Sequence, residues 1–199
     1  GLAPVNYVSD PDEWLVLLRV PSLWRVLVPT DGTLDDDELR SDKMKNKIFD
    51  GLTGDGASVE TRHRTLYRVH QRVAKSFVEN RVVLIGDSAH LNNPLGGFGM
   101  NSGVHDAFNL FQKLEPLLKS KPANGGLEHY DRQRRKVTHS FTQTQTIENM
   151  KFIRGGNGGD AHERKRLEML AIKQDDVRRR DYLMRQAMYE SLAQAEAIN

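Results

Sequence analysis

Two short apolar runs, residues 14–20 and 24–29, begin the regular patterning of the chain. Both are rich in valine, leucine and tryptophan, and Pro21 and Ser22 between them are typical of a turn. The pattern therefore predicts an antiparallel hairpin. Because both runs are apolar at consecutive positions, we expect a sheet that is covered on both faces.

The next part of the chain changes from a helical to a strand-like pattern. Residues 34–49 are polar with a moderate helical tendency, which predicts a helix with Thr33 as its N-cap, followed by a loop at residues 50–56. From residue 59 to 73 apolar residues alternate with arginines, so we expect a strand with one buried and one basic face. The arginines of that face are Arg62, Arg64, Arg68 and Arg72. The unbroken apolar run at residues 81–85 is typical of a buried parallel strand.

The remainder of the chain is helical in its spacing of apolar residues. A glycine-rich loop at residues 91–100 leads into a helix over 101–118, and further helices are expected over 127–153 and 161–197. The glycines within residues 155–159 predict a linker. We therefore expect an α/β chain with antiparallel strands first, then a strand, a glycine loop and a helix, and finally a helical tail.

Composition and charge exclude several classes of protein. The 199 residues carry 29 basic and 27 acidic side chains, a net charge of +2, which implies no strong attraction to nucleic acid or to a membrane. Cysteine is absent, which excludes disulfides, thiolate nucleophiles and thiolate metal sites. The sequence has neither an apolar run of membrane-spanning length nor a signal-peptide pattern, so we expect a soluble cytoplasmic protein. The seven histidines lack metal-ligand spacing, and no metal site is predicted.

The segment 81–110 carries the most specific chemistry in the chain. It places Asp87 directly after an apolar strand, and the carboxyl ends of strands are where α/β sheets bind ligands. A carboxylate there can accept hydrogen bonds from ribose hydroxyls. Glycines in the following loop let the backbone lie against a flat ligand, and the next helix offers free N–H groups to negative charge. The combination predicts a flavin nucleotide site; the alternative is a structural turn that binds no ligand.

The same segment resembles the second flavin-binding motif of the group A flavoprotein aromatic hydroxylases, a family that includes para-hydroxybenzoate hydroxylase and phenol hydroxylase. The family pattern is an apolar strand, Gly-Asp-Ala-Ala-His, one or two prolines, Gly-Gly-x-Gly-x-Asn-x-Gly and Asp-Ala-x-Asn-Leu. This chain departs from it mildly at Ser88 and Asn93. Trp24-Arg25 and residues 67–74 resemble the middle sheet that roofs the substrate cavity in this family. The resemblance covers residues 1–150.

The resemblance implies a set of cofactor-binding residues. Asp87 is expected to reach ribose or ribityl hydroxyls, and the loop glycines and proline to lie beside the isoalloxazine. The backbone at the start of the helix is expected at the pyrimidine end of the ring. The set comprises Gly86, Asp87, Pro94, Gly96, Gly97, Gly99, Met100 and Asn101. His90 is expected to pack and hydrogen-bond, Asp106 and Asn109 to tie the helix to a neighbouring loop, and no catalytic acid or base is identifiable.

The resemblance also implies an activity and a division of the chain. The activity is that of an FAD-dependent monooxygenase that hydroxylates a small phenolic substrate with NAD(P)H and O2. Residues 1–78 would then belong to the substrate-binding middle sheet, and residues 79–153 to the second half of the FAD-binding domain. Residues 154–199 would form a linker and a carboxyl-terminal helix.

Two signatures of the family are absent from this sequence. One is the Gly-x-Gly-x-x-Gly of the opening βαβ unit, which cradles the FAD pyrophosphate at a helix N-terminus. The other is Asp-Gly-x-x-Ser followed by arginine; residues 55–58 imitate it and are interpreted as a loop. The chain therefore resembles only the carboxyl-terminal portion of such an enzyme, and we expect it to hold FAD poorly by itself. A missing amino-terminal half or a complementary chain is the expected partner, and assembly into a homo-oligomer is left open.

Two other functions stay open at this point. A flavin oxidoreductase of the same fold could act on a non-aromatic substrate. A chain without the pyrophosphate cradle could instead be a non-catalytic partner or a regulatory remnant. The arginine face within residues 62–72 fits a solvated surface, or pairing with the missing half, better than it fits an anionic substrate.

Overall fold

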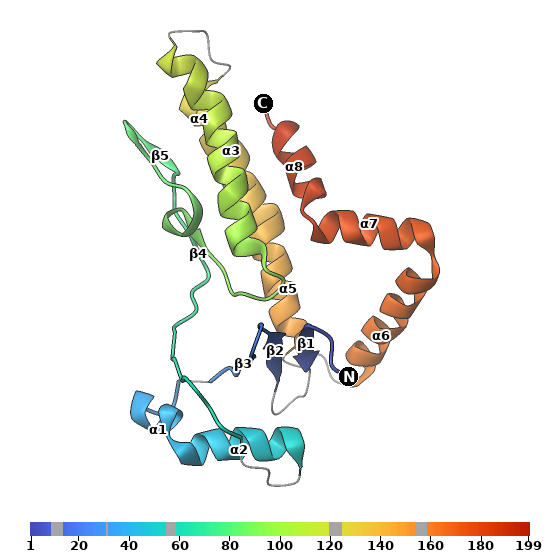
Figure 1. Ribbon diagram of the computed structural model, residues 1–199. Helices are drawn as coiled ribbons and strands as arrows, with labels where there is room; N and C mark the ends of the chain where they lie inside the picture. Colours follow the sequence, from blue (N-terminus) through green and yellow to red (C-terminus); the bar gives the residue numbers. More distant parts are fainter. Residues whose placement is uncertain (9–13, 31, 55–58, 120–124, 154–158) are drawn as a thin grey trace. The chain divides into compact units, whose positions relative to one another are not determined.

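The computed structural model describes residues 1–8, 14–30, 32–54, 59–119, 125–153 and 159–199 (Figure 1). The chain divides into two compact units: residues 1–68 with a short piece around Ile153, and residues 69–152 with 157–199. The assignment of residues 1–78, 79–153 and 154–199 to three functional regions stays a prediction. Within the described ranges, no helix combines the length and the apolar character needed to cross a membrane.

The first unit contains a three-stranded antiparallel sheet in the order β1-β2-β3. Its strands are β1 (Val5–Val8), β2 (Leu15–Arg19) and β3 (Trp24–Leu27), with Val16 opposite both Tyr7 and Leu27. The predicted hairpin is confirmed, and backbone hydrogen bonds between Val20 and Leu23 close its turn. Val5 and Trp24 are exposed on opposite faces, so the expected full covering of both faces is wrong.

The single helix expected over residues 34–49 is two helices, α1 (Asp36–Arg40) and α2 (Asp42–Thr53). Their N-caps are Asp35 and Ser41 rather than Thr33, because the Ser41 side chain accepts from Met44 N at 3.1 Å and so starts a new helix. The loop expected from residue 50 begins only at Gly54, where the backbone is left-handed and ends α2.

The strand predicted over residues 59–73 is wrong except at its end, where β4 (Arg72–Val73) pairs with β7 (His90–Leu91). Alternation gives a segment a strand tendency, but a strand forms only where a neighbouring backbone pairs with it. Two arginines of the expected basic face contact the first helices instead. Arg64 donates to Arg40 O at 2.6 Å and pairs with Asp42, and Arg68 lies 3.9 Å from Asp36. Residues 55–58, expected as a loop, lie outside the described residues.

At residues 81–85 a strand forms only at Val82–Val83, and the expected burial and parallel pairing are wrong. Here β5 (Val78–Glu79) and β6 (Val82–Val83) form a short antiparallel hairpin, and Val82 is 62% exposed. The apolar run indicates a strand but does not specify which segment pairs with it. In this structure the partner of β6 is β5, the segment immediately before it. The left-handed backbone of Asn80 makes the tight turn between the two strands.

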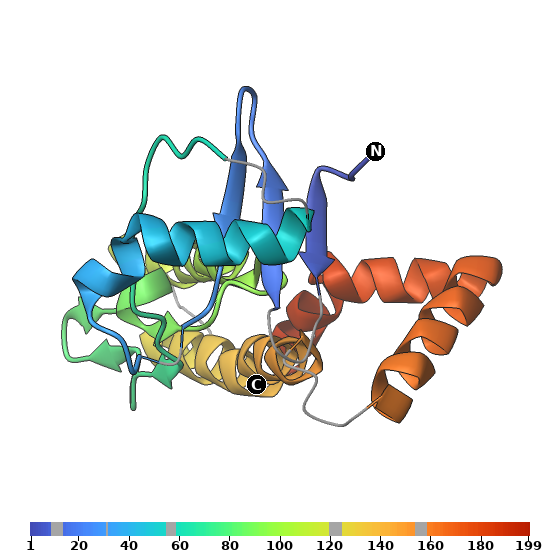
Figure 2. The ribbon, with the colours of Figure 1, turned by 90° about the horizontal axis from the view of Figure 1, so that it is seen from below.

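Helices form the rest of the second unit. They are α3 (Phe98–Leu118), α4 (Gly126–Val137), the π-helical segment Thr138–Gln143, α5 (Thr144–Ile153), α6 (Gly159–Gln174), α7 (Asp176–Gln186) and α8 (Tyr189–Glu196). The run from α4 to α5 is continuous, as expected for residues 127–153. The expected final helix is three helices, because Asp175 caps α7 and Met188 adopts a left-handed backbone before α8 (Figure 2). Most of the predicted linker, residues 155–158, lies outside the described residues.

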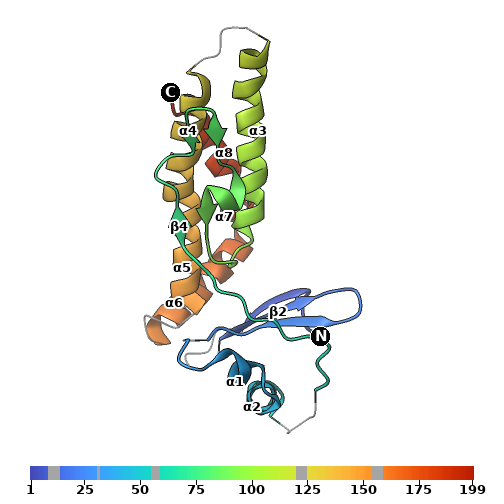
Figure 3. The ribbon, with the colours of Figure 1, turned by 90° about the vertical axis from the view of Figure 1, so that its left-hand side faces the viewer.

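Two apolar clusters hold the second unit together. Phe98, at the first position of α3, packs edge-on against Phe141 with ring centroids 5.8 Å apart, in a cluster with Met188, the N-cap of α8. Burial of one such phenylalanine contributes about 1.5–3 kcal/mol. The second cluster joins Phe77 and Ala89 to Tyr130 of α4. The first cluster therefore fixes the start of α3, which runs beside α4 (Figure 3).

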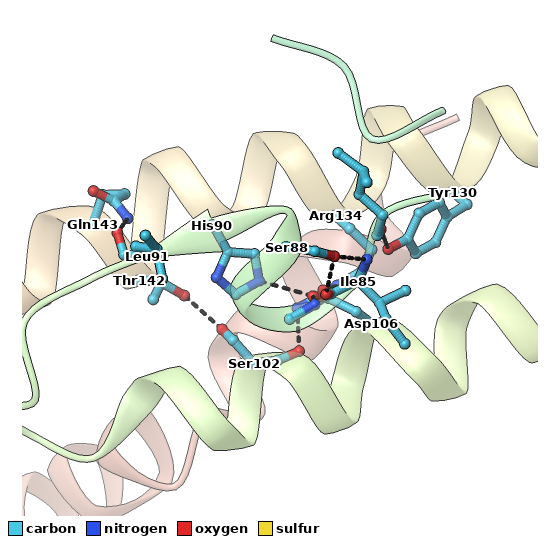
Figure 4. Close-up of polar contacts among 12 residues, drawn as sticks. Ile85, Ser88, His90, Leu91, Ser102, Asp106, Tyr130, Arg134, Thr142 and Gln143 are labelled. Atoms are coloured by element: carbon cyan, nitrogen blue, oxygen red, sulfur yellow. Dashed lines mark hydrogen bonds and ion pairs between the residues drawn. The ribbon is translucent and has the colours of Figure 1, made fainter. Parts of the chain in front are cut away.

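A buried carboxylate connects three segments of this unit (Figure 4). Asp106 of α3 accepts from Arg134 Nε of α4 and from His90 Nε2, each at 2.7 Å, and from the backbone N–H of Gly86 at 3.0 Å. Burial raises the pKa of the Asp106 carboxyl, but the His90 hydrogen bond and the Arg134 charge outweigh burial and hold this pKa below its ordinary value. Asn109 binds Gln133 of α4 at 2.9 Å, rather than a loop as expected.

Replacing Asp106 by asparagine is expected to lower the free energy of unfolding at pH 7 by about 3–5 kcal/mol, because the buried Arg134 guanidinium loses its counter-charge. Urea denaturation followed by circular dichroism measures the change. Asp181→Asn removes the same charge from an exposed position of α7 and should shift the free energy by less than about 0.5 kcal/mol. A D106N chain as stable as the wild type would contradict this role for the carboxylate.

The Asp106 contribution has a defined pH dependence. Its folded pKa lies below the unfolded value of about 4, so the ionised carboxylate stabilises the fold fully above that value. The stabilisation is lost as the pH falls through the folded pKa. The difference in unfolding free energy between wild type and D106N is therefore expected to be largest at neutral pH and to shrink in acid, and a difference that grows in acid would show the sign to be wrong.

Candidate functional site

A tight turn follows β6 and presents the first of the predicted cofactor residues. Gly86–Ser88 form one turn of 3-10 helix, and Gly86 has a left-handed φ of 55° that suits glycine. Ser88 Oγ accepts from Ile85 N at 3.2 Å and donates to Ile85 O at 2.8 Å. The backbone of Gly86 is held in addition by Asp106, so both ends of the turn are fixed.

The turn lies against the backbone of α3. A Cβ atom on Gly103 would come within 3.2 Å of Gly86 Cα, closer than ordinary van der Waals contact. This approach favours glycine at position 103, which lies in the motif segment 81–110 but was not among the predicted site residues. A glycine in the interior of an otherwise helical segment was the signal that could have found it. Gly103 is five residues after Phe98, the first residue of α3. The Gly86–Ser88 turn therefore contacts the helix about 8 Å along its axis from Phe98.

Asp87 is exposed at the centre of this turn. Within the part of the chain that the structure describes, its carboxylate has no hydrogen-bond or ion-pair partner. Its backbone is nevertheless fixed by the contacts of Gly86 and Ser88 on either side. A positioned carboxylate without a protein partner is available to accept hydrogen bonds from a ligand.

The loop between β7 and α3 is anchored by a residue that the sequence analysis did not select. Asn93 is buried, its Nδ2 donates to Gln71 Oε1 at 3.1 Å and to Thr146 O at 2.9 Å, and its Oδ1 accepts from Leu95 N at 3.1 Å. Pro94 is exposed beside it. Asn93 had been noted only as a mild departure from the family pattern, and nothing local in the sequence marks it as an anchor.

The glycines of this loop have different physical roles. A Cβ on Gly96 would lie 2.4 Å from the ring of Phe98, and one on Gly99 would lie 3.3 Å from Asn92 Oδ1, so both positions serve packing within the chain. Gly97 has a left-handed φ of 70°, and a Cβ there would meet no atom within 4 Å among the described residues. Gly97 is therefore the loop glycine that leaves an open, flat stretch of backbone.

Gly97 is also the N-cap of α3, a helix of 21 residues. Among the described residues no side chain caps this end, so the first N–H groups of the helix are available to an anion or to a group with partial negative charge. Asn101 Nδ2 donates to Gly97 O at 3.0 Å, and the Met100 side chain is exposed. Of the eight predicted residues, Asp87, Gly97 and the Met100 N–H thus present open binding groups, and Pro94 is exposed. The side-chain positions of Gly86, Gly96 and Gly99 shape the turn and loop, and Asn101 binds back to Gly97.

These features fit a nucleotide that carries hydroxyls and a flat ring. The exposed carboxylate suits a hydroxyl donor, the open glycine suits a ring face, and the uncapped helix suits an electron-rich edge. Groups of histidine and acidic residues that could hold a metal ion are absent from the described residues. His90 is buried on Asp106 and has the packing and hydrogen-bonding role that was expected of it.

Comparison with known proteins places this geometry in a family. A family model described as an FAD binding domain matches residues 19–145. The chain is 36% identical to para-nitrophenol 4-monooxygenase from Pseudomonas sp. (strain WBC-3), a match that covers 77% of this chain and 39% of the relative. It is 29% identical to 6-hydroxy-3-succinoylpyridine 3-monooxygenase from Pseudomonas putida, over 81% of this chain and 41% of the relative. The chain thus spans about two fifths of the length of these relatives.

Solved structures give the same answer. The fold of p-nitrophenol 4-monooxygenase from Pseudomonas putida DLL-E4 matches with a TM-score of 0.81 and 30% identity, over 96% of this chain and 48% of that one. The flavin-dependent monooxygenase PieE, solved with FAD and substrate, matches in fold with a TM-score of 0.64 at 24% identity. The family model, the identity and the shared fold together establish that the chain belongs to the FAD-binding domain family of group A aromatic hydroxylases.

Proposed function

We propose that this chain forms part of the flavin site of a monooxygenase that hydroxylates a small phenolic ring with NAD(P)H and O2. The observation that carries the proposal is the turn at Asp87, packed through Gly86 against Gly103 of α3 and followed by an open glycine at the uncapped start of the same helix. Because the chain belongs to the FAD-binding family, we infer that these features bind FAD.

Each open group has a role in this proposal. Asp87 accepts hydrogen bonds from ribose or ribityl hydroxyls of FAD, and the Gly97 backbone lies beside the isoalloxazine ring. The N–H groups at the start of α3 stabilise negative charge at the pyrimidine end of the ring. When bound, FAD supplies the redox chemistry of oxygen activation; the protein contributes orientation, electrostatics and exclusion of water.

The substrate class is inferred from the relatives. Para-nitrophenol, 6-hydroxy-3-succinoylpyridine and pentachlorophenol, the compounds in the names of three matching monooxygenases, are all aromatic rings that bear a hydroxyl group. We therefore assign a small hydroxylated aromatic ring to this chain. Residues 1–78, which include the sheet β1-β2-β3, are proposed to border that substrate.

The activity requires more of the family fold than this chain contains. The chain covers 39–48% of the relatives and the solved structure that it matches. We propose that the remaining portion, either a preceding half or a complementary chain, completes the FAD site.

Asp87→Ala tests the cofactor role of the carboxylate. The experiment uses a chimera in which this chain replaces the matching half of the Pseudomonas putida DLL-E4 p-nitrophenol 4-monooxygenase. We expect the chimera to retain FAD and D87A to weaken FAD binding by about 10- to 100-fold, because a hydrogen bond to a charged group is lost. Fluorescence titration with FAD measures the affinity, and Asp181→Ala, which removes an exposed acid of α7, should leave it unchanged.

Gly97→Ala tests whether open backbone at the helix start meets the ring. Alanine in the left-handed conformation costs about 1 kcal/mol of stability, and its methyl group would occupy the surface that the ring needs. Gly54→Ala is the matched control, since Gly54 also has a left-handed backbone and open space at a helix end. Both variants should lose similar stability in thermal melts of the chimera, and only G97A should lose FAD affinity.

The outcomes separate the candidate functions. A chimera that binds FAD and oxidises NAD(P)H in a phenol-dependent manner supports the monooxygenase. A folded chimera that takes up no FAD would favour a non-catalytic partner. Equal FAD affinity in G97A and G54A would contradict the proposed contact between the Gly97 backbone and the isoalloxazine ring.

A further inference from the structure

The loop between β7 and α3 has a buried side and an exposed side, and its residues alternate between them. Asn93 and Leu95 are buried, whereas Pro94 and Gly96 are exposed. The two exposed residues belong to the predicted cofactor set, and the two buried ones do not. The position of the exposed side therefore depends on what holds the buried side.

Side chains of one helical run, from the π-helical segment into α5, hold the buried side of the loop. Gln143 Nε2 donates to Leu91 O at 2.9 Å (Figure 4). One and a half turns further along the run, Asn149 Nδ2 donates to Leu95 O at 3.3 Å. The backbone between these two side chains accepts from Asn93, as described above. Every second residue of the loop is thus tied to the helical run, which fixes the register of the loop on it.

Gln71 completes the anchor of the loop from another part of the chain. Its Oε1 accepts from the backbone N–H of Asn93 at 3.0 Å and from Asn93 Nδ2 at 3.1 Å. Its Nε2 donates to Thr146 Oγ1 at 2.8 Å. Both ends of the Gln71 carboxamide are therefore used, and Asn93 is held between α5 and the segment that directly precedes β4. Gln71 was not among the predicted site residues.

Asn93 also begins two consecutive turns that lead to the helix. Its Oδ1 accepts from Leu95 N at 3.1 Å, which is an Asx turn around Pro94. Pro94 O in turn accepts from Gly97 N at 3.0 Å and closes a four-residue turn. The third residue of that turn, Gly96, has the positive φ of 97° that a type II turn requires there. The backbone at Gly97 is therefore placed by turns that start from the anchored Asn93.

We propose that Asn93 and Gln71 are positioning residues of the flavin site, which together set the place of the Gly97 backbone against which the isoalloxazine lies. This inference rests on the proposed function, and neither residue belongs to the proposed cofactor contacts. Asn93 acts through the two turns, and Gln71 acts through Asn93. A ligand binds only those molecules whose loop is in the binding conformation, so loosening the anchor lowers the apparent FAD affinity in proportion.

Amide hydrogen exchange of the 199-residue chain tests the positioning without any ligand. The readout is the N–H of Gly97, whose own acceptor, Pro94 O, is untouched by the substitutions. Asn93→Ala and Gln71→Ala are each expected to speed its exchange by about 10-fold, because the turn opens more often once its anchor is lost. Asn109→Ala is the matched control, since it removes a carboxamide hydrogen bond between α3 and α4 and should leave this rate unchanged. Equal Gly97 rates in N93A and wild type would overturn the proposal.

FAD affinity in the chimera described above tests the link to the cofactor. N93A and Q71A should each weaken FAD binding by about 10-fold in fluorescence titrations, and N109A should not. The double variant N93A/Q71A should bind FAD no more weakly than N93A, because Gln71 acts through Asn93. The visible absorption spectrum of the bound flavin should shift in N93A, where the backbone beside the ring moves, and stay unchanged in N109A. A purely structural role of the pair would lower thermal stability without either effect on the flavin.

The remaining outcomes distinguish this proposal from the proposed function. FAD uptake that depends on Asp87 but is equal in N93A, Q71A and N109A retains the flavin site and overturns the proposal. Losses of affinity that add up in the double variant would show that Gln71 acts independently of Asn93, which overturns the pair. Faster Gly97 exchange in N93A, together with a chimera that takes up no FAD, supports the positioning of Gly97 by Asn93 and refutes the flavin site.

Discussion

The carboxylate of Asp106 is the constraint on which the second unit depends. It is fully buried and accepts hydrogen bonds from the Gly86 backbone, from His90 and from Arg134, which belong to three separate segments. Because an uncompensated charge in a low-dielectric interior is so unfavourable, each donor has to stay in place as long as the carboxylate is there. One side chain thereby sets the position of the turn, the orientation of α3 and the pairing of α3 with α4.

The exposure of the Asp87 carboxylate follows from that arrangement. With Gly86 held against α3, the adjoining Asp87 is positioned without using its own side chain, which leaves the carboxylate for a ligand. The polar face of α3 packs against α4, and Met100, Val104 and Phe108 on the other side of the helix are exposed.

Helices and strands that are set by a local sequence pattern of a few residues could be predicted from the sequence. The hairpin of β2 and β3 follows from two apolar runs around Pro21 and Ser22, and α3 follows from helical spacing after a glycine-rich loop. The strands expected at residues 59–73 and 81–85 form only at Arg72–Val73 and Val82–Val83, and for one reason. A strand is stabilised by the backbone beside it, and the pattern of one segment does not say which other segment will supply that backbone.

The sequence by itself determined the family and the order of turn, glycine loop and helix, because the motif in residues 81–110 has a fixed spacing that local chemistry explains. Only the tertiary structure decided that Gly97 is open while Gly96 and Gly99 serve packing, and that Gly103 admits the turn. It also decided that α3 turns its apolar side outward. These outcomes depend on contacts between residues far apart in the chain, such as Asp106 with Arg134. Local preferences give several arrangements similar free energies, and the cost of leaving buried polar groups unpaired selects among them.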